Sequence, residues 1–230
     1  KDKGLNASMI ERCQQAEFDA MALTVDTIVS GKRERCLRSG FTTPPRFSAS
    51  SLWSYATRPR WTLDYVFGPK FRLPNLDGHV EEGSGKAVSI QDYFNTMLDT
   101  NMDWDTAARI RQDWGGTFAL QGIMSAGDAR KAVEIGADAI WISNHGGRQL
   151  DGSRAPFDQL TEIVEAVDGE IEIILDGGVR RGTHVLKSLA AGATAASGGR
   201  LYLYALAAAG QDGVERAVQI LKEEIERGMR

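Results

Sequence analysis

The 230-residue chain has few of the residues that would commit it to a metal-bound or disulfide-linked structure. Its two cysteines, Cys13 and Cys36, form no CxxC pattern and no metal-ligand spacing. We therefore expect no metal site and no disulfide framework, and we expect both thiols to be inert. A reducing compartment is the simpler interpretation of this cysteine content.

The chain also lacks an excess of positive charge and a long hydrophobic run. It has 27 Lys and Arg against 31 Asp and Glu, a net charge of −4, which gives no electrostatic case for a nucleic-acid partner. No apolar run approaches the roughly 18 residues of a membrane span, and the first residues lack the pattern of a signal peptide. We therefore predict a cytoplasmic protein, with peripheral attachment to the inner face of the membrane as the alternative.

Short apolar runs alternate with helical patterns along the chain, as they do in repeated βα units. The predicted strands are Ala20–Val25, Thr117–Leu120, Ala139–Ile142, Glu172–Leu175 and Ala193–Ala196. The predicted helices are Ala7–Phe18, Asp103–Asp113, Ala126–Ile135, Phe157–Val167, Thr183–Ala191 and Gly213–Gly228. Short, repeated connections favour a (β/α) barrel over a doubly wound sheet. Five units do not close an eight-stranded barrel, so we interpret residues 1–230 as a single, incomplete barrel domain, the C-terminal part of a larger one.

One segment interrupts this alternation: residues 42–100, an insertion rich in proline, glycine and aromatic residues after the first strand. Connections of this length are usually lids or disordered segments. The insertion interleaves aromatic rings with positive charges, namely Trp53, Tyr55, Arg58, Arg60, Trp61, Tyr65, Phe67, Lys70, Phe71 and Arg72. A lid packed on its own domain is the favoured interpretation. The alternative is contact with an anionic membrane or with an electron-transfer partner.

The most informative motif is the run Ser143–Asp151, which follows directly after the predicted strand Ala139–Ile142. It places His145 and Arg148 three residues apart with two glycines between them. The glycines allow the backbone to turn, so that both side chains can face one small ligand. This arrangement favours a proton acceptor beside an anion-binding group, which suits chemistry on a carboxylate substrate. A glycine turn with a solvent-facing His and Arg is the alternative.

Polar residues follow the other predicted strands, whose carboxyl ends meet at one mouth of a barrel. Asp26 is the natural carboxylate to pair with His145, since it would raise the basicity of the ring and fix its orientation; the alternative is a turn-capping Asp. Arg33 offers a second guanidinium for a carboxylate beside Arg148. The glycine-rich loops Asp176–Gly182 and Ser197–Arg200, each with arginine, together favour a phosphate site. Two further histidines, His79 and His184, fit surface positions.

These motifs together resemble the FMN-dependent α-hydroxy-acid oxidase and dehydrogenase family, which includes glycolate oxidase, mandelate dehydrogenase and the flavin-linked L-lactate dehydrogenases. The resemblance covers nearly the whole chain, and its motifs stand in family order: Leu23–Asp26, Gly31–Arg35, Ser143–Asp151, Leu175–Gly182 and Gly199–Arg200.

The resemblance implies a TIM barrel of the FMN-linked type that oxidises a small L-2-hydroxy acid by hydride transfer to flavin N5. It implies that His145 is the general base, Asp26 its partner, and Arg33 and Arg148 the groups that hold the substrate carboxylate. The implied cofactor contacts are Thr24, Gln121, Ser143, Asp176, Gly178, Arg180, Gly199 and Arg200. It also implies an electron acceptor, which could be oxygen, a quinone or a cytochrome, and a homo-oligomer.

The chain departs from the family pattern in two places. Gln121 stands where the family has a lysine whose charge supports the reduced flavin, and Cys36 replaces an aspartate after the Arg-Glu-Arg run. The family's first three βα units are also absent from these residues, so we expect this chain alone to hold FMN weakly or not at all. Two other interpretations stay open: a catalytically silent barrel fragment that serves as an assembly partner, and a different FMN- or phosphate-binding barrel related to inosine-monophosphate dehydrogenase. The barrel related to inosine-monophosphate dehydrogenase is the less favoured of these two, because the catalytic cysteine loop of those enzymes is missing from this sequence.

Overall fold

The computed structural model describes residues 3–32, 34–40, 48–69, 98–149 and 152–230. The chain forms two compact units. The larger unit consists of Cys13–Gly31 and Asp99–Arg230, and the smaller one of Lys1–Arg12 and Lys32–Leu98.

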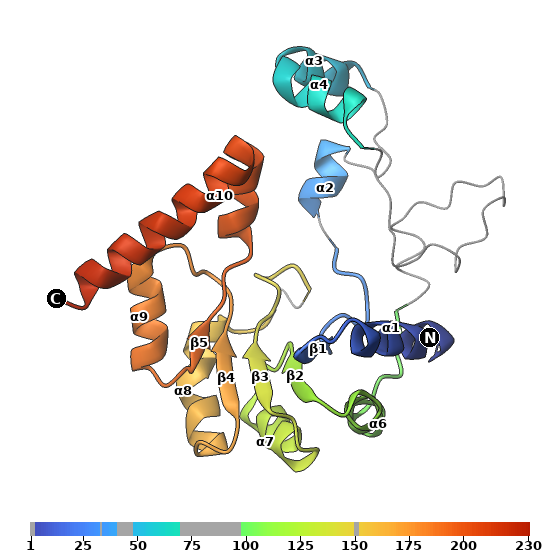
Figure 1. The fold of residues 1–230 in the computed structure, drawn as a ribbon, viewed down its shortest axis with the longest axis vertical. Helices are drawn as coiled ribbons and strands as arrows, with labels where there is room; N and C mark the ends of the chain where they lie inside the picture. The colour runs from blue at the N-terminus through green and yellow to red at the C-terminus, as the bar shows by residue number, and fades with distance from the viewer. Residues whose placement is uncertain (1–2, 33, 41–47, 70–97, 150–151) are drawn as a thin grey trace. The chain divides into compact units, whose positions relative to one another are not determined.

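The larger unit is built on one five-stranded parallel sheet whose strands follow chain order (Figure 1). The strands are β1 (Ala20–Thr24), β2 (Thr117–Gln121), β3 (Ala139–Ile142), β4 (Glu172–Leu175) and β5 (Ala195–Ala196). All five predicted strands are present, although the last is only two residues long. A doubly wound sheet would reverse its strand order at a switch point. The unbroken order is that of consecutive units of a barrel, as predicted.

Five helices accompany these strands in the described part of the larger unit. They are α6 (Trp104–Trp114), α7 (Ala126–Glu134), α8 (Pro156–Val167), α9 (Gly182–Ala190) and α10 (Arg200–Gly228). Asp103 and Ser125 cap α6 and α7, because each side chain accepts a hydrogen bond from the backbone three residues on. The helix predicted at Gly213–Gly228 is present as the second part of α10. The first part, which begins at Arg200, was not predicted, and the two parts are separated by a kink at Ala209 and Gly210, whose φ and ψ are not helical.

The hydrophobic core lies on the face of the sheet that the helices cover. Phe118, Leu120, Ile140 and Ile142 alternate along β2 and β3 and are fully buried, and α8 packs against β3 and β4. The opposite face has one row of registered side chains near the carboxyl ends: Thr24, Gln121, Trp141, Ile174 and Ala195. None of them is buried as a residue. In a closed barrel this row would face the interior.

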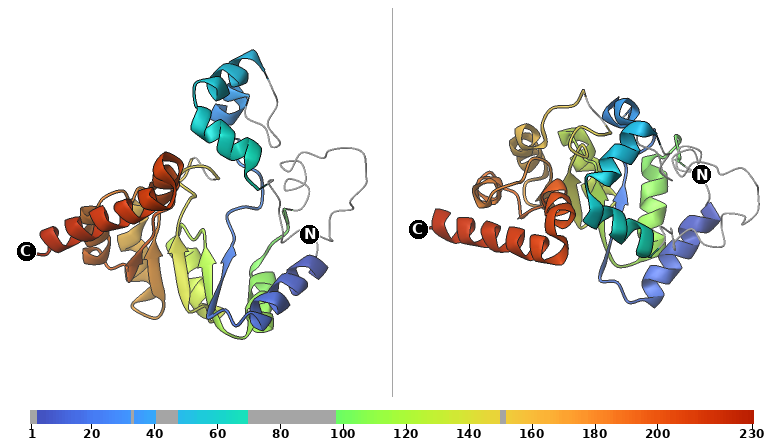
Figure 2. Two further views of the ribbon diagram at one scale, coloured as in Figure 1. Left: turned by 45° about the horizontal axis from the view of Figure 1, so that its top comes forward. Right: turned by 90° about the horizontal axis from the view of Figure 1, so that it is seen from above.

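The smaller unit contains a helical hairpin that the sequence did not predict. Within the insertion, α3 (Ala49–Ala56) and α4 (Pro59–Phe67) lie side by side (Figure 2). A capping box at Ser48 and Ser51 starts α3, and Trp61 stacks between Tyr55 and Tyr65 at centroid distances of 5.4 and 5.2 Å. Two more of the described helices have residues in this unit: α1 (Lys3–Gln15), which ends in the larger unit, and α2 (Glu34–Ser39).

Among the described residues, no helix combines the length and the hydrophobicity needed to cross a bilayer.

Candidate active site

The structure brings Asp26 and His145 into direct contact at the carboxyl ends of β1 and β3. Asp26 Oδ2 lies 2.7 Å from His145 Nδ1. The Asp26 side chain is 8% exposed and that of His145 31%, so the carboxylate is buried while the ring reaches solvent. Asp26 Oδ1 is buried and has no hydrogen-bond partner in the described structure. The imidazole is therefore the one group shown to compensate the desolvation of this carboxylate.

Gly122 makes room for this pair. Its φ is +106°, and a Cβ built on it would lie 2.8 Å from Asp26 Cβ, Cγ and Oδ1. Any other residue would therefore strain its own backbone and push the carboxylate away. His145 itself has a φ of +54°, a left-handed conformation that is uncommon for a non-glycine residue and that occurs at functional sites.

Ser143 connects the His145 turn to the next strand. This side chain is fully buried, and its Oγ donates to Asp176 Oδ2 at 2.8 Å while accepting from the His145 backbone N at 3.1 Å. The hydroxyl thus ties the end of β3 to the first residue after β4. Two predicted cofactor contacts, Ser143 and Asp176, are therefore paired with each other.

Thr24 and Gln121 form a second pair, one strand apart in the same register. Thr24 Oγ1 donates to Gln121 Oε1 at 2.9 Å. Because the amide oxygen accepts this bond, the Gln121 NH2 group is left to donate elsewhere. The pair offers a neutral hydrogen-bond donor at the carboxyl ends of the strands, at the position where the family resemblance implies a lysine.

The loop after β1 lies against the loop after β3. Gln149 crosses between them, with its Oε1 accepting from Gly31 N and its Nε2 donating to Val29 O, both at 3.3 Å. A Cβ on Gly31 would lie 2.0 Å from the carbonyl oxygen of Arg148. Arg148 is in the same turn as His145, with an exposed side chain. Arg33 lies outside the described residues, so the predicted pair of arginines is placed only in part.

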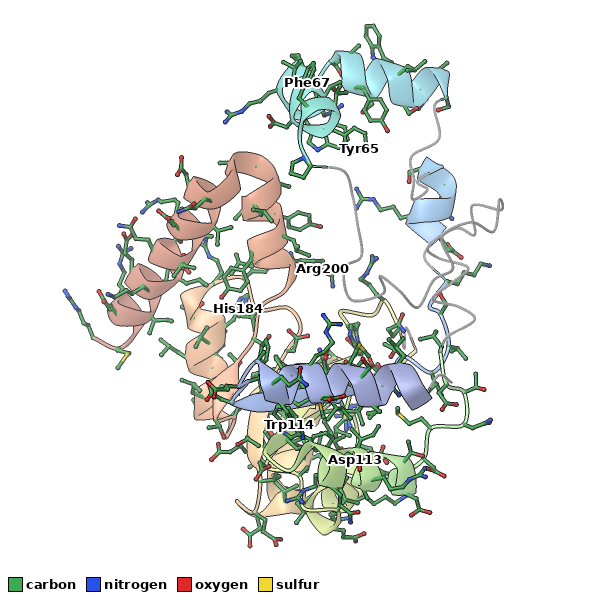
Figure 3. The ribbon with its side chains drawn as sticks, turned by 45° about the vertical axis from the view of Figure 1, so that its right-hand side comes forward. Tyr65, Phe67, Asp113, Trp114, His184 and Arg200 are labelled. Atoms are coloured by element: carbon green, nitrogen blue, oxygen red, sulfur yellow. The ribbon has the colours of Figure 1, made fainter. Side chains whose placement is uncertain are left out.

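The glycine-rich loops line a cavity of about 530 Å³. Its lining includes Gly146, Gly177 and Gly178 together with the basic residues His184, Lys187 and Arg200, and no Asp or Glu among the described residues lines it. Arg200 Nη2 donates to Gly146 O at 2.9 Å, and a Cβ on Gly146 would collide with that guanidinium. Figure 3 labels His184 and Arg200, which come from α9 and from the start of α10.

These donors fit the phosphate of FMN. Gly178 has a φ of +77°, and a Cβ on it or on Gly199 would meet nothing within 4 Å, so both backbones are open to a ligand. Arg180 is exposed on the first loop. Arg180 and Gly199 are not part of the cavity lining. The basic side chains and the open Gly178 backbone that do line it are donors of the kind that a phosphate requires, and no carboxylate among the described residues lines it to repel an anion.

A second cavity, of about 570 Å³, is lined in part by Asp26. Its lining includes Asp26, Asp103, Trp104, Asp128 and Arg154. Hydrogen bonds from the side chain and backbone of Thr106 lower the pKa of Asp103. This shift reflects the capping of α6, and no group of metal-ligating residues occurs in the described part of the chain.

The roles of several residues of the site were not predicted from the sequence. His184, expected at the surface, is half-buried and lines the phosphate cavity with Lys187. Their spacing of three residues on a predicted helix was a usable signal, because it places both on one face. Gly122 and Gly146 are needed for close approaches between loops that no local pattern reveals. His79 lies outside the described residues, as does the side chain of Cys36.

Comparison with known proteins agrees with this geometry. The family model described as FMN-dependent dehydrogenase matches residues 1–230. The chain is 39% identical to an L-lactate dehydrogenase of Alcaligenes faecalis and 39% identical to an L-lactate oxidase of a Nostoc species, covering 98% of this chain in each case. It covers 59% and 56% of those two proteins. The chain thus spans little more than half the length of the curated relatives it matches.

Solved structures give the same result. A crystal structure of the monotopic membrane protein (S)-mandelate dehydrogenase matches with a TM-score of 0.87 and 32% identity, covering 97% of this chain and 58% of that one. A putative lactate oxidase of Pediococcus acidilactici matches with a TM-score of 0.78 and 31% identity, covering 100% of this chain and 54% of that one.

The fold is that of the carboxyl-terminal units of an FMN-linked TIM barrel. The chain belongs to the FMN-dependent dehydrogenase family. The predicted family, fold class and family cofactor are confirmed.

Proposed function

We propose that the chain supplies the acid–base and phosphate-binding part of an enzyme that oxidises a small L-2-hydroxy acid, similar to lactate, to the 2-keto acid. The observation that carries this proposal is the contact of 2.7 Å between Asp26 and His145 at the mouth of the sheet. The names of the relatives, L-lactate dehydrogenase and L-lactate oxidase, support the substrate class.

His145 acts as the general base. Its Nδ1 donates to Asp26, so its Nε2 carries the lone pair that accepts the hydroxyl proton of the substrate. The imidazolium that results is stabilised by the buried carboxylate, and unit charges about 4 Å apart near a protein surface interact by about 4 kcal/mol. Ser143 holds the backbone of His145 in place.

Arg148 binds the substrate carboxylate, with Arg33 as its proposed second partner. Arg148 is exposed in the same turn as His145, so an anion held by its guanidinium lies next to the base. The planar guanidinium holds a carboxylate in one orientation through parallel N–H donors. The orientation of the carboxylate in turn determines which proton of the substrate lies next to His145.

Thr24, Gln121, Ser143 and Asp176 would hold the ring and ribityl parts of FMN. Its phosphate would be held by Gly178, Arg180, Gly199 and Arg200. When bound, FMN supplies the acceptor for the hydrogen and the two electrons that leave the α-carbon. Gln121 contributes a neutral hydrogen bond to this site and no charge. We therefore expect slower substrate oxidation and a lower flavin potential than in relatives that have the lysine.

Flavin absorbance in the complete gene product tests this proposal. Under anaerobic conditions, L-lactate, glycolate or mandelate should bleach the oxidised flavin, while nucleotides and D-lactate should leave it unchanged. A flavoprotein that no 2-hydroxy acid reduces would contradict the proposal.

A second candidate function is assembly. β1 and β5 each pair with one strand only in the described sheet, and Gln121 replaces the family lysine. These observations support a catalytically silent barrel fragment that completes itself on a partner chain. Such a fragment would form a stoichiometric complex with its partner and would bring about no substrate-dependent bleaching.

The α3–α4 hairpin is the proposed contact with a membrane surface. Trp53 is 73% exposed and Phe67 81%, and Arg58 and Arg60 are exposed beside them. Exposed rings with interleaved positive charge suit an anionic interface, and one relative is named a monotopic membrane protein. We propose a cytoplasmic homo-oligomer that attaches peripherally and passes electrons to a quinone, a cytochrome or oxygen.

Co-sedimentation with anionic vesicles tests the contact. Trp53→Ser with Phe67→Ser should reduce binding by at least about tenfold, because each ring buries a large apolar area at an interface. Phe157→Ser, which removes a 45% exposed ring from α8, is the control. Equal binding by the hairpin variant and the control would exclude the hairpin.

A further inference from the structure

One nitrogen of His184 lies within hydrogen-bond distance of two groups on the phosphate loop. His184 Nδ1 is 3.1 Å from Gly178 O and 3.3 Å from Arg180 N. The first group is an acceptor and the second is a donor. The two flank Val179, which is buried, so both bonds act on the exposed parts of one short, anchored loop.

The ring can satisfy only one of these groups at a time. An imidazole nitrogen carries either a proton or a lone pair. With the proton on Nδ1, His184 donates to Gly178 O and leaves the Arg180 N–H free. With the lone pair on Nδ1, it accepts from Arg180 N and occupies that donor. The protonated ring, with hydrogen on both nitrogens, can only donate to Gly178 O and leaves the Arg180 N–H free, whereas the neutral ring accepts from Arg180 N when its one proton is on Nε2.

The surroundings of His184 make this choice relevant to an anion. His184 lines the phosphate cavity with Lys187 of its own helix and Arg200 of α10. Arg180 and Arg181 precede His184 in the chain, on the loop that leads into α9. Glu224 of α10 is engaged elsewhere, since it accepts from Gly182 N at 2.7 Å and pairs with Arg181 at 3.3 Å. Ser188 Oγ donates to the His184 carbonyl at 2.7 Å, which holds the start of α9 in place.

We propose that His184 is a positioning residue that couples anion binding on the 177–182 loop to its own protonation. A bound phosphate group favours the protonated ring, which donates to Gly178 O, leaves the Arg180 N–H free on the loop and adds a positive charge to the cavity. That this anion is the phosphate of FMN rests on the proposed function. The coupling itself concerns any phosphate or sulfate bound at the loop.

NMR of the imidazole nitrogens tests the coupling on the 230-residue chain. The chain has three histidines, and His184 is assigned by the signals that disappear in His184→Asn. Sulfate is the first probe because its charge is constant over the pH range, and inorganic phosphate and FMN follow. Bound sulfate should shift the titration midpoint of His184 upward, and sulfate should bind about fivefold more tightly to the protonated form. That factor corresponds to two unit charges about 4 Å apart in water.

Two variants separate coupling from a simple structural role. His184→Asn keeps a group near Nδ1 that can donate or accept but cannot ionise, so it should bind sulfate with no dependence on pH. Lys187→Gln removes a charge from the same face of α9, so it should bind more weakly at every pH and keep the His184 midpoint shift. An unchanged midpoint on sulfate addition, or the same pH dependence in His184→Asn as in the original chain, would overturn the coupling.

The FMN titration distinguishes this inference from the proposed function. If sulfate shifts the His184 midpoint but the complete gene product binds no FMN, the coupling stands and the proposed cofactor site fails. If FMN binds and 2-hydroxy acids reduce it while His184→Asn leaves the pH dependence of binding unchanged, the function stands and the coupling fails.

Discussion

Replacing Gly122 by alanine should separate Asp26 from His145 and destabilise the larger unit. A Cβ at this position would lie 2.8 Å from three atoms of the Asp26 side chain. The left-handed backbone alone costs about 1–2 kcal/mol for a non-glycine residue. Loss of the hydrogen bond to the buried carboxylate adds about 1.5–3 kcal/mol. Together these effects predict a fall of about 2.5–5 kcal/mol in the free energy of unfolding.

Gly169→Ala is the matched control, because Gly169 has a φ of +78° and nothing within 4 Å of its Cβ position. It carries the backbone strain without the collision, so it should cost only about 1–2 kcal/mol. Urea unfolding measures both losses, and the nitrogen shifts of His145 report whether its Nδ1–H still donates. Equal destabilisation by the two alanines, with an unchanged His145 Nδ1 signal, would refute the assignment of Gly122 as the residue that makes room for the pair.

Three further predictions follow from the site and the core. Asp26→Asn should slow flavin reduction by 2-hydroxy acids on the order of 100-fold or more, because Nδ1 loses the partner that stabilises the protonated ring; an unchanged stopped-flow rate would count against the pair. Gln121→Lys should raise both the rate of flavin reduction and the reduction potential of the flavin, because it places a positive charge at the carboxyl ends of the strands. A redox titration that shows no rise in the flavin potential would contradict this. Leu160→Ala, at a fully buried position on α8, should cost about 2–5 kcal/mol in urea unfolding, whereas Leu189→Ala, 42% exposed on α9, should cost less than about 1 kcal/mol.

The barrel units were predictable from sequence because their signals are local. Each predicted run of four to six residues is followed by a polar residue, and β3 and β4 begin and end at the predicted residues. A helix boundary near Gly210 is present, since Ala209 and Gly210 have non-helical φ and ψ within α10. The helical part before them, from Arg200, was not predicted.

The pairing of Asp26 with His145 was predictable because parallel strands bring their carboxyl ends together. The supporting contacts were not. The close approach of Gly122 to Asp26, and that of Gly146 to Arg200, depend on the distance between loops that are far apart in sequence. The hydrogen bonds of the His184 ring depend on how α9 begins. Such distances are set by tertiary packing, which residue patterns do not encode locally.

Anaerobic mixing of the flavin-loaded complete gene product with L-lactate, beside its His145→Gln variant, measures whether His145 acts as the general base. We expect L-lactate to bleach the oxidised flavin, and to do so on the order of 100-fold to 10,000-fold more slowly in the variant, the contribution expected of a general base. Bleaching at the same rate in both proteins would contradict this expectation.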